Sequence, residues 1–264
     1  LPRQADFDAA IMSLATALTW DSDLRALTLD KFSPDSLSGI LKIIFQSCKE
    51  LKQISFENYT EPLNQTFDLT TPSSSKISEI SFDNLHPSVI FSLLDGMHES
   101  LSKYKLVILS KTLLSSNELK SFLDILNTSL PFTNLQKLVI EDGPADNARL
   151  EDLASFLLLS KIYVLHMLKS NKDITDMAQC VFDNTSTIRY LNFNGGKLSK
   201  QIAIDQLNLP SSLVYLDLSK SRVSASALQA FLAALFANPK HNLLTLNLSE
   251  LDNSNSSESL TKIF

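Results

Sequence analysis

Residues 213–235 read LVYLDLSKSRVSASALQAFLAAL, and residues 104–126 read YKLVILSKTLLSSNELKSFLDIL. The two stretches align without a gap, so that Leu109 coincides with Leu218 and the pair Ser110-Lys111 with Ser219-Lys220. Their offset of 109 residues, from 104 to 213, is too long for one supersecondary unit. We therefore expect further copies of a shorter repeat between them.

The recurring element is the pattern L-x-x-L-x-L, in which three apolar residues of a short strand point to one side. It occurs nine times, and the first residues of successive copies are 25 to 31 residues apart. We number each repeat from this first apolar residue. The nine triplets, at repeat positions 1, 4 and 6, are Leu24/Leu27/Leu29, Leu51/Ile54/Phe56, Ile77/Ile80/Phe82, Tyr104/Val107/Leu109, Leu135/Leu138/Ile140, Ile162/Leu165/Met167, Ile188/Leu191/Phe193, Leu213/Leu216/Leu218 and Leu243/Leu246/Leu248.

A helix is predicted in the second half of each repeat. In the fourth repeat, Leu119, Phe122, Leu123 and Leu126 are spaced so that they share one helical face. A strand and a helix within 25–31 residues make the long form of a leucine-rich repeat. The predicted fold is an α/β leucine-rich-repeat solenoid, a curved horseshoe arc with parallel strands on its concave face and helices on its convex face.

Two parts of the chain depart from this pattern. The segment Asn58–Ser75 contains two prolines and a serine run, so we expect a surface loop or a degenerate helix there. The ninth residues of the repeats do not form a continuous asparagine series, so the loops must satisfy their buried backbone groups otherwise.

The predicted domain organisation has two parts. Residues 1–22 contain apolar side chains at helical spacing and are expected to form an N-terminal capping helix. Residues 23–264 are expected to form about nine leucine-rich repeats, of which the last is incomplete. The sequence given is expected to be part of a longer chain.

Composition and motifs argue against several functions. The net charge of −6 and pI of about 5.2 do not fit a nucleic-acid binder, which needs clustered Lys and Arg. The four histidines stand in different repeats without partners at ligand spacing, and catalytic motifs are absent. We expect a non-enzymatic cytoplasmic protein that binds no cofactor or metal and makes no membrane contact through this segment. Its two cysteines, Cys48 and Cys180, are expected to be core thiols.

The remaining candidate for function is the concave surface, formed by repeat positions 3, 5 and 7. In the first three repeats its only charged residues are acidic: Asp30, Glu57, Glu79 and Asp83. Later strands place aliphatic side chains and two tyrosines where water is expected, which suggests a protein partner. Two alternatives stay open, namely a strand register shifted by one residue and a patch covered by another part of the full chain. The predicted partner-binding strip is Leu106, Ile108, Val139, Val164, Leu168, Tyr190 and Tyr215.

Two stretches resemble the CARMIL proteins, which are cytoskeletal linkers that regulate actin capping protein. They are Ile11–Asn58, with its helix, strand, helix and L-x-x-L-x-L-E-N-like strand, and Leu209–Ser249, with its Leu-Pro lead-in, Leu-Ser-Lys loop and Ala-Asn-Pro after the helix. The resemblance implies an interaction scaffold whose partners are cytoskeletal regulators. In that family the segment that binds capping protein lies beyond the repeats, so no binding residue is carried over.

Long repeats of this kind are shared by the wider ribonuclease-inhibitor-like class. The alternatives are therefore a GTPase-activating or inhibitor-type regulator, similar to the Ran GTPase activator or ribonuclease inhibitor, and the sensor array of an immune receptor. A GTPase activator would need a distinctive polar loop surface, and we find none in the sequence. An immune receptor would need nucleotide-binding sequence before Leu1.

Overall fold

A computed structural model of the chain contains two compact units. Unit 1 comprises Leu1–Ile108 with Ser129–Asn134, and unit 2 comprises Leu109–Thr128 with Leu135–Phe264. The structure describes residues 13, 16–17, 24–31, 34–63, 67, 75–97, 103–112, 114–128, 134–142, 150–168, 175–184, 187–198, 209–237 and 242–251. The predicted capping helix lies outside these residues, except that Ser13, Thr16 and Ala17 are helical.

Strands and helices alternate along most of the chain. Unit 1 contains β1 (Ala26–Asp30), α2 (Pro34–Ser47), β2 (Gln53–Glu57), β3 (Glu79–Asp83) and α3 (Pro87–Gly96), and β4 (Leu106–Ser110) begins in it. Unit 2 contains α4 (Ser116–Thr128), β5 (Lys137–Glu141), α5 (Leu150–Leu159), β6 (Val164–Leu168), α6 (Thr175–Asn184), β7 (Tyr190–Asn192), β8 (Lys197–Leu198), β9 (Tyr215–Asp217), β10 (Arg222–Val223), α7 (Ala225–Ala237) and β11 (Thr245–Asn247).

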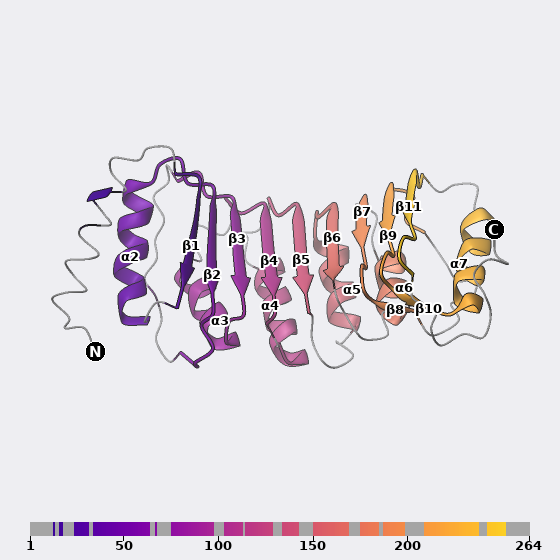
Figure 1. Ribbon diagram of the computed structural model, residues 1–264, viewed down its shortest axis with the longest axis horizontal. Coiled ribbons are helices and arrows are strands. Elements are labelled where there is room, and N and C mark those ends of the chain that lie inside the picture. Colours follow the sequence, from indigo (N-terminus) through magenta and orange to yellow (C-terminus); the bar gives the residue numbers. More distant parts are fainter. Residues whose placement is uncertain are drawn as a thin grey trace. The chain divides into compact units, whose positions relative to one another are not determined.

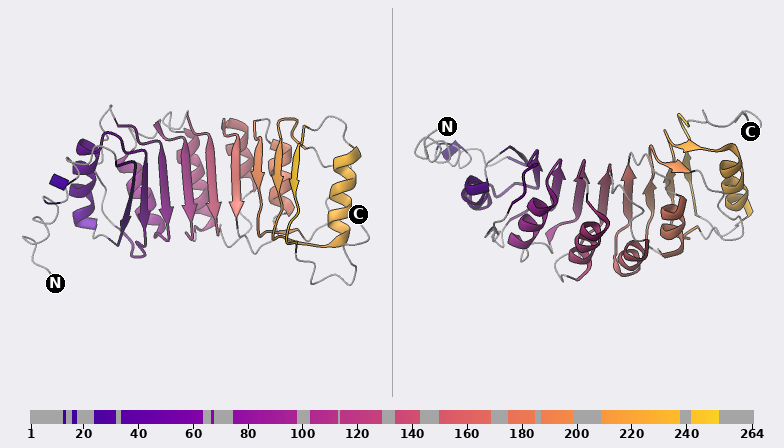
Figure 2. Two further views of the ribbon diagram at one scale, coloured as in Figure 1. Left: turned by 45° about the horizontal axis from the view of Figure 1, so that its top comes forward. Right: turned by 90° about the horizontal axis from the view of Figure 1, so that it is seen from below.

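The main strands form a sheet in the order β1-β2-β3-β4-β5-β6-β7-β9-β11, and β8 pairs with β10 separately. Equivalent repeat positions pair in parallel register, as Leu27 does with Ile54 in unit 1 and Leu165 with Leu191 in unit 2. Within each unit the helices lie on one side of the strands and leave the other side open (Figures 1 and 2). This repeated strand–helix arrangement confirms the predicted α/β leucine-rich-repeat solenoid.

The apolar triplets form the core. From the second to the eighth repeat, every side chain at positions 1, 4 and 6 is buried. The predicted helix face of the fourth repeat, from Leu119 to Leu126, is buried with them. In the first repeat Leu24 and Leu27 are partly exposed and Leu29 is buried, and the triplet of the ninth repeat is partly exposed. The strand register predicted from the sequence is therefore confirmed, and the alternative of a one-residue shift is excluded.

The same pair of backbone hydrogen bonds joins most consecutive repeats. The carbonyl at position 2 accepts from the N–H groups at positions 2 and 3 of the next repeat. Gln136 accepts from Tyr163 and Val164, at 3.0 and 3.2 Å, and Tyr163 in turn accepts from Arg189 and its neighbour, at 2.9 and 3.0 Å. Because each bond reaches only the adjacent repeat, the sheet is built from a single local contact used many times.

The residue at position 8 turns the chain out of each strand with a left-handed backbone. All eight described residues at this position have a φ angle between 48° and 78°, and Gly195 is the only glycine among them. Asparagine and aspartate tolerate this conformation best, whereas other side chains are strained by about 1–2 kcal/mol. The N–H of Lys220 here donates to the carbonyl of Ser249, at 3.0 Å, so the strain is offset by a further inter-repeat bond. The remaining position-8 residues are Lys31, Asn58, Asn84, Lys111, Asp142 and Glu250.

Hydroxyl groups replace part of the missing asparagine series at position 9. The buried Thr112 donates from Oγ1 to the carbonyl of Ser110, at 3.0 Å. The buried Ser221 donates from Oγ to the carbonyl of Phe193, at 3.2 Å. The hydroxyl groups of these short side chains thus donate to buried carbonyls in the loops. They satisfy part of the backbone hydrogen bonding that a continuous asparagine series would provide.

The second repeat has no helix among its described residues, as its prolines and serines predict. Its loop packs instead against α3, where the N–H of Leu63 donates to Oγ of Ser88, at 2.8 Å. Phe67 is buried, and its backbone lies so close to Gly96 that a Cβ there would overlap it. A loop therefore occupies part of the space that a helix fills in other repeats.

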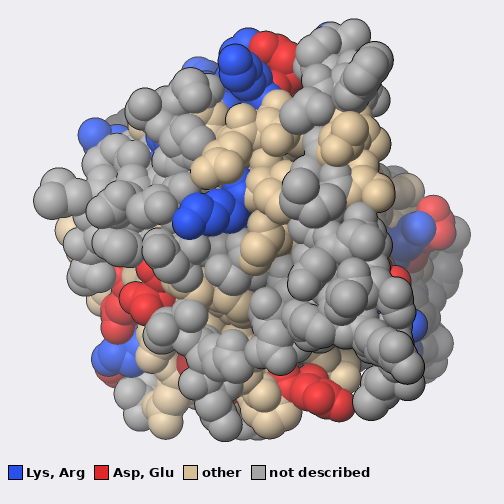
Figure 3. Space-filling view, turned by 90° about the vertical axis from the view of Figure 1, so that its left-hand side faces the viewer, with Lys and Arg blue, Asp and Glu red and all other residues tan. Residues whose placement is uncertain are grey.

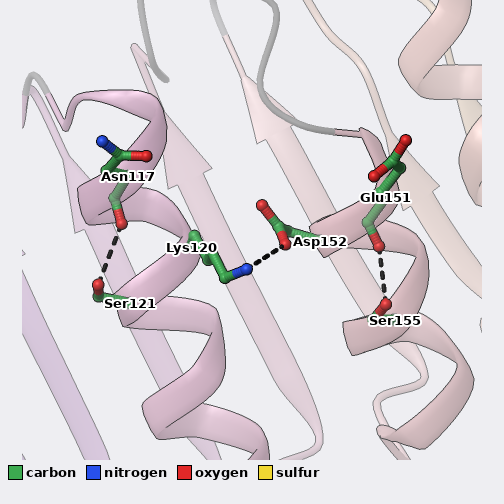
Figure 4. A network of polar contacts seen from close by, with 6 residues as sticks. All are labelled: Asn117, Lys120, Ser121, Glu151, Asp152 and Ser155. Atoms are coloured by element: carbon green, nitrogen blue, oxygen red, sulfur yellow. Dashed lines mark hydrogen bonds and ion pairs between the residues drawn. The ribbon is translucent and has the colours of Figure 1, made fainter.

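Polar contacts connect the helices α4 and α5 of unit 2 (Figure 4). Nζ of Lys120 lies 3.3 Å from Oδ1 of Asp152, across the two helices. Within the helices, Ser121 and Ser155 each donate to a carbonyl one turn earlier, at 3.1 and 2.8 Å. These polar groups form their hydrogen bonds and ion pair within the helical layer, and the apolar face of each helix packs against the core.

Candidate functional site

The helix-free face of unit 2 carries three rows of outward side chains, set by the register of β5, β6, β7, β9 and β11. The first row, at position 3, is Lys137, Val164, Tyr190, Tyr215 and Thr245. The second row, at position 5, is Val139, His166, Asn192, Asp217 and Asn247. The third row, at position 7, begins with Glu141 opposite Leu168 and continues with Asn194, Ser219 and Ser249.

The centre of the first row is aromatic. The rings of Tyr190 and Tyr215 lie 6.2 Å apart between centroids with an interplanar angle of 37°. Tyr190 is 43% exposed, and the half-buried Val164 lies opposite it on β6. Aromatic rings with one polar end are the side chains that most often anchor protein interfaces. We call Val164, Tyr190 and Tyr215 the tyrosine patch.

Asp217 fixes the position of Tyr215. The Tyr215 hydroxyl and the Asn247 amide donate to its Oδ2, at 3.0 and 3.1 Å, and the Ser219 N–H donates to its Oδ1, at 2.8 Å. Burial opposes the charge of Asp217, but hydrogen bonds from Ser219, Tyr215 and Asn247 outweigh it and lower the pKa of the carboxyl. The pKa of Tyr215 is raised, by burial and by its bond to Asp217. The Tyr215 ring of the patch is thus held in one orientation before any partner binds.

His166 lies in the second row, between Val139 on β5 and Asn192 on β7. Its burial and, to a smaller extent, the charge of Lys137 lower its pKa from 6.5 to about 4, against an opposing effect of Asp217. The imidazole is therefore neutral at physiological pH. It contributes a hydrogen-bonding group to this face, not a charge.

The seven predicted strip residues fall into two groups. Leu106 and Ile108 are half-buried on β4 in unit 1. Val139, Val164, Leu168, Tyr190 and Tyr215 share the helix-free face of unit 2. Only the second group can be described as one surface.

Val139 corrects the prediction. It lies on the expected face but is only 7% exposed, so it offers almost no area to a partner. Several polar residues on outward positions are equally buried, among them Ser219 and Asp217. Close packing of side chains between adjacent strands produces this burial, which alternation along one strand does not predict.

Some exposed apolar side chains were not predicted. Tyr163 and Leu244 occupy position 2, just before the strands, and Leu244 is 84% exposed. Leu158, at 66%, and Leu159 are exposed at the end of α5. The signal for position 2 was available in the sequence, since a residue adjacent to an inward one points away from the core. Tyr163 and Leu244 extend the apolar character of unit 2 beyond the tyrosine patch.

Unit 1 presents a different outward surface. Asp30, Glu57 and Asp83 are in register on β1, β2 and β3, and we call them the acidic row. The amide of Asn58 donates to Asp30, and that of Asn84 donates to the Asn58 carbonyl oxygen, each at 2.8 Å. On the side of unit 1 where α2 lies, by contrast, described acidic and basic side chains form small separate groups (Figure 3).

The described residues offer little for chemistry. Within them, no group of three or more His, Cys, Asp or Glu side chains is arranged to hold a metal ion. Cys48 and Cys180 are buried, and burial raises the pKa of the Cys180 thiol, which makes it a poor nucleophile. No helix in the described part of the chain is long and apolar enough to cross a membrane.

Comparisons with known proteins add one structural neighbour. No protein-family model matches the chain, and no curated protein sequence is significantly similar to it. Among solved structures, the chain is similar to an internalin (inlF) from Listeria monocytogenes str. 4b F2365. The identity is 17%, the match covers 94% of this chain and 68% of that chain, and the TM-score is 0.44. At these values the likeness supports no argument about function, and the fold assignment rests on the repeat geometry.

Proposed function

We propose that this protein is a non-enzymatic protein-interaction scaffold that binds a partner protein through the helix-free face of unit 2. One observation supports this most directly. The tyrosine patch exposes aromatic surface on a face that no described helix covers, while Asp217 holds Tyr215 in place. A pre-organised aromatic surface loses little entropy on binding, which favours its use as an anchor.

The surroundings of the patch fit a protein partner better than a small molecule. Val164 and Leu168 supply aliphatic surface, and neutral amides such as Asn192 and Asn194 lie in the next two rows. An apolar centre with hydrogen-bonding groups around it is the usual composition of a protein interface. The expected partner surface is uncharged at its centre and complementary to tyrosine.

The partner class that we propose first is a cytoskeletal regulator in the cytoplasm. Its support is the sequence resemblance of Ile11–Asn58 and Leu209–Ser249 to the CARMIL proteins. The repeats would then serve as the scaffold of a longer chain that regulates actin capping protein. The structural neighbour contributes nothing to this part of the proposal.

Affinity capture tests the proposal with matched variants. The protein and two variants, Tyr190→Ser and Leu158→Ser, are immobilised at equal amounts, and proteins retained from a cytoplasmic extract are identified by mass spectrometry. Tyr190→Ser removes an exposed aromatic group from the patch, whereas Leu158→Ser removes an exposed aliphatic group from α5. Loss of a well-buried interface side chain costs about 1.5–3 kcal/mol, so retention should fall at least about tenfold for Tyr190→Ser alone.

Two results would contradict this reading. Equal retention by both variants would mean that the tyrosine patch is not the binding surface. Stimulated GTP hydrolysis by small GTPases in the presence of the protein would favour the alternative, a GTPase-activating regulator. Actin-regulating proteins among the Tyr190-dependent partners would support the cytoskeletal assignment in particular.

A further inference from the structure

A cavity lies in unit 1 beside the second repeat, whose described residues include no helix. In the helical layer, α2 of the first repeat and α3 of the third stand on either side of this repeat (Figure 1). Described residues from α2, α3 and the segment after β2 enclose a volume of about 330 Å³. The cavity thus lies next to the segment whose prolines and serines depart from the helical pattern of the other repeats.

The lining combines an apolar floor with a polar rim. The floor is formed by buried side chains from α2, α3 and the loop, and the rim by exposed residues around the opening. The floor residues are Leu37, Tyr59, Leu63, Phe67 and Val89, and the rim includes Lys31, Thr60, Glu61 and Pro62. Apolar cavities with a few polar groups at the mouth are typical ligand sites, and this volume is near their lower limit. It fits one side chain of a partner rather than a large cofactor.

The charge next to the cavity determines what kind of partner fits. The acidic row ends one residue before the rim, because Asp30 precedes Lys31 and Glu57 precedes Asn58. With Asp83 and Glu61, four carboxylates stand against the single ammonium of Lys31. Like charges in register across neighbouring strands repel one another and destabilise a sheet. A cation placed over them is therefore attracted to several carboxylates at once.

We propose that this cavity and the acidic row together bind a basic peptide segment of a partner protein. One aliphatic or aromatic side chain of the segment enters the cavity, and its flanking Lys or Arg residues lie over the acidic row. This site lies in unit 1 and uses none of the residues of the tyrosine patch, so it is independent of the proposed function of unit 2.

Fluorescence anisotropy with defined peptides tests the proposal. The probe is a fluorescein-labelled nonapeptide with a central leucine between two groups of four arginines. The reference peptide has serine in place of leucine, so that it reports non-specific attraction to a chain of net charge −6. The leucine peptide should bind at least about tenfold more tightly than the serine peptide, which is the effect expected from burying one aliphatic side chain.

Variants connect this difference to the cavity. Thr60→Trp places a large side chain on an exposed rim position and should abolish the preference for leucine. Ser226→Trp makes a comparable change at an exposed position of α7 and should leave the preference intact. Replacing Asp30 by Asn and Glu57 by Gln together should weaken both peptides by about fivefold in low salt, as expected for two exposed ion pairs.

Each outcome has one reading. Equal binding of the leucine and serine peptides to the unmodified protein overturns the proposal, as does an unchanged preference in Thr60→Trp. Equal affinities before and after neutralising Asp30 and Glu57 overturn the role of the acidic row. Circular dichroism verifies the fold of each variant. If Thr60→Trp does not fold, Pro62→Trp on the same rim is measured in its place, and the same results apply.

Discussion

Replacing His166 by glutamine should make the stability of the protein less sensitive to acid. In the folded chain, burial and the charge of Lys137 lower the pKa of His166 to about 4, while Asp217 acts weakly in the opposite direction. In the unfolded chain the imidazole has its ordinary pKa of about 6.5. Between pH 6.5 and about 4, His166 therefore binds a proton in the unfolded state but not in the folded state. The free energy of unfolding falls as the pH decreases through this range.

The size of the effect follows from the two pKa values. Taken at face value, they lower the free energy of unfolding by about 2 kcal/mol between pH 7 and pH 5. Because His166 is only half-buried, solvent screening reduces this to about 1 kcal/mol. His166→Gln removes the titration, so the wild type should lose about 1 kcal/mol more than the variant over this interval. Aspartate and glutamate side chains titrate mostly below it and contribute equally to both proteins.

Urea unfolding followed by circular dichroism at pH 7, 6 and 5 measures this difference. A proton NMR titration locates the midpoint of His166, which is assigned by comparison with the variant, since the other histidines are His86, His98 and His241. A midpoint near 6.5, or parallel loss of stability in both proteins, would show that the imidazole is open to water. The description of the second row as partly desolvated would then fail.

Four further substitutions test other features of the fold, each by thermal or urea unfolding. Gly96→Ala should destabilise the protein by about 1–3 kcal/mol, because the new Cβ would overlap the backbone of Phe67. Gly39→Ala should stabilise the protein by about 0.5–1 kcal/mol, because Gly39 lies in α2 with open space around it. Equal effects at the two glycines would contradict the packing of the loop on α3. Lys220→Gly should stabilise by about 0.5–1 kcal/mol, since glycine relieves the left-handed strain at φ 57°; a loss of stability would argue against strain there. Asp217→Asn should lower the free energy of unfolding by about 1–3 kcal/mol and change the near-ultraviolet circular dichroism of the tyrosines, because the new NH₂ group would face hydrogen-bond donors. An unchanged spectrum would disprove the role of Asp217 in positioning Tyr215.

The fold could be predicted because its signal is periodic and local. The triplet Leu213/Leu216/Leu218 and its equivalents need only the alternation of a strand and the spacing of a helix to be recognised. The absence of a helix among the described residues after β2 was also predictable, since prolines and serines do not continue a helix. The left-handed residue at position 8 was not, because lysine at Lys31 or Lys220 carries no local sign of that conformation.

The candidate site was harder to predict because its properties arise between strands. Alternation places Tyr190 and Val139 on one face, but only the neighbouring side chains decide that the first is exposed and the second buried. The role of Asp217 depends on donors from three positions, including Asn247 on the next strand. The cavity beside Tyr59 is lined by residues from α2, α3 and the segment after β2. None of these properties is carried by a single segment of sequence.

The uniform backbone bonding between repeats also bears on how such a chain can change in length. The carbonyl of Gln136 bonds the start of the sixth repeat, and that of Tyr163 bonds the start of the seventh, through the same pair of donors. If residues 162–187 were deleted as a block, the carbonyl of Gln136 could accept from the N–H groups of Arg189 and Tyr190. The pattern of backbone hydrogen bonds between repeats would then be unchanged. Duplicating a block would be equally neutral for the backbone, and only side-chain packing would need to adapt. Addition or loss of whole repeats is therefore compatible with two stretches, 104–126 and 213–235, that align residue by residue.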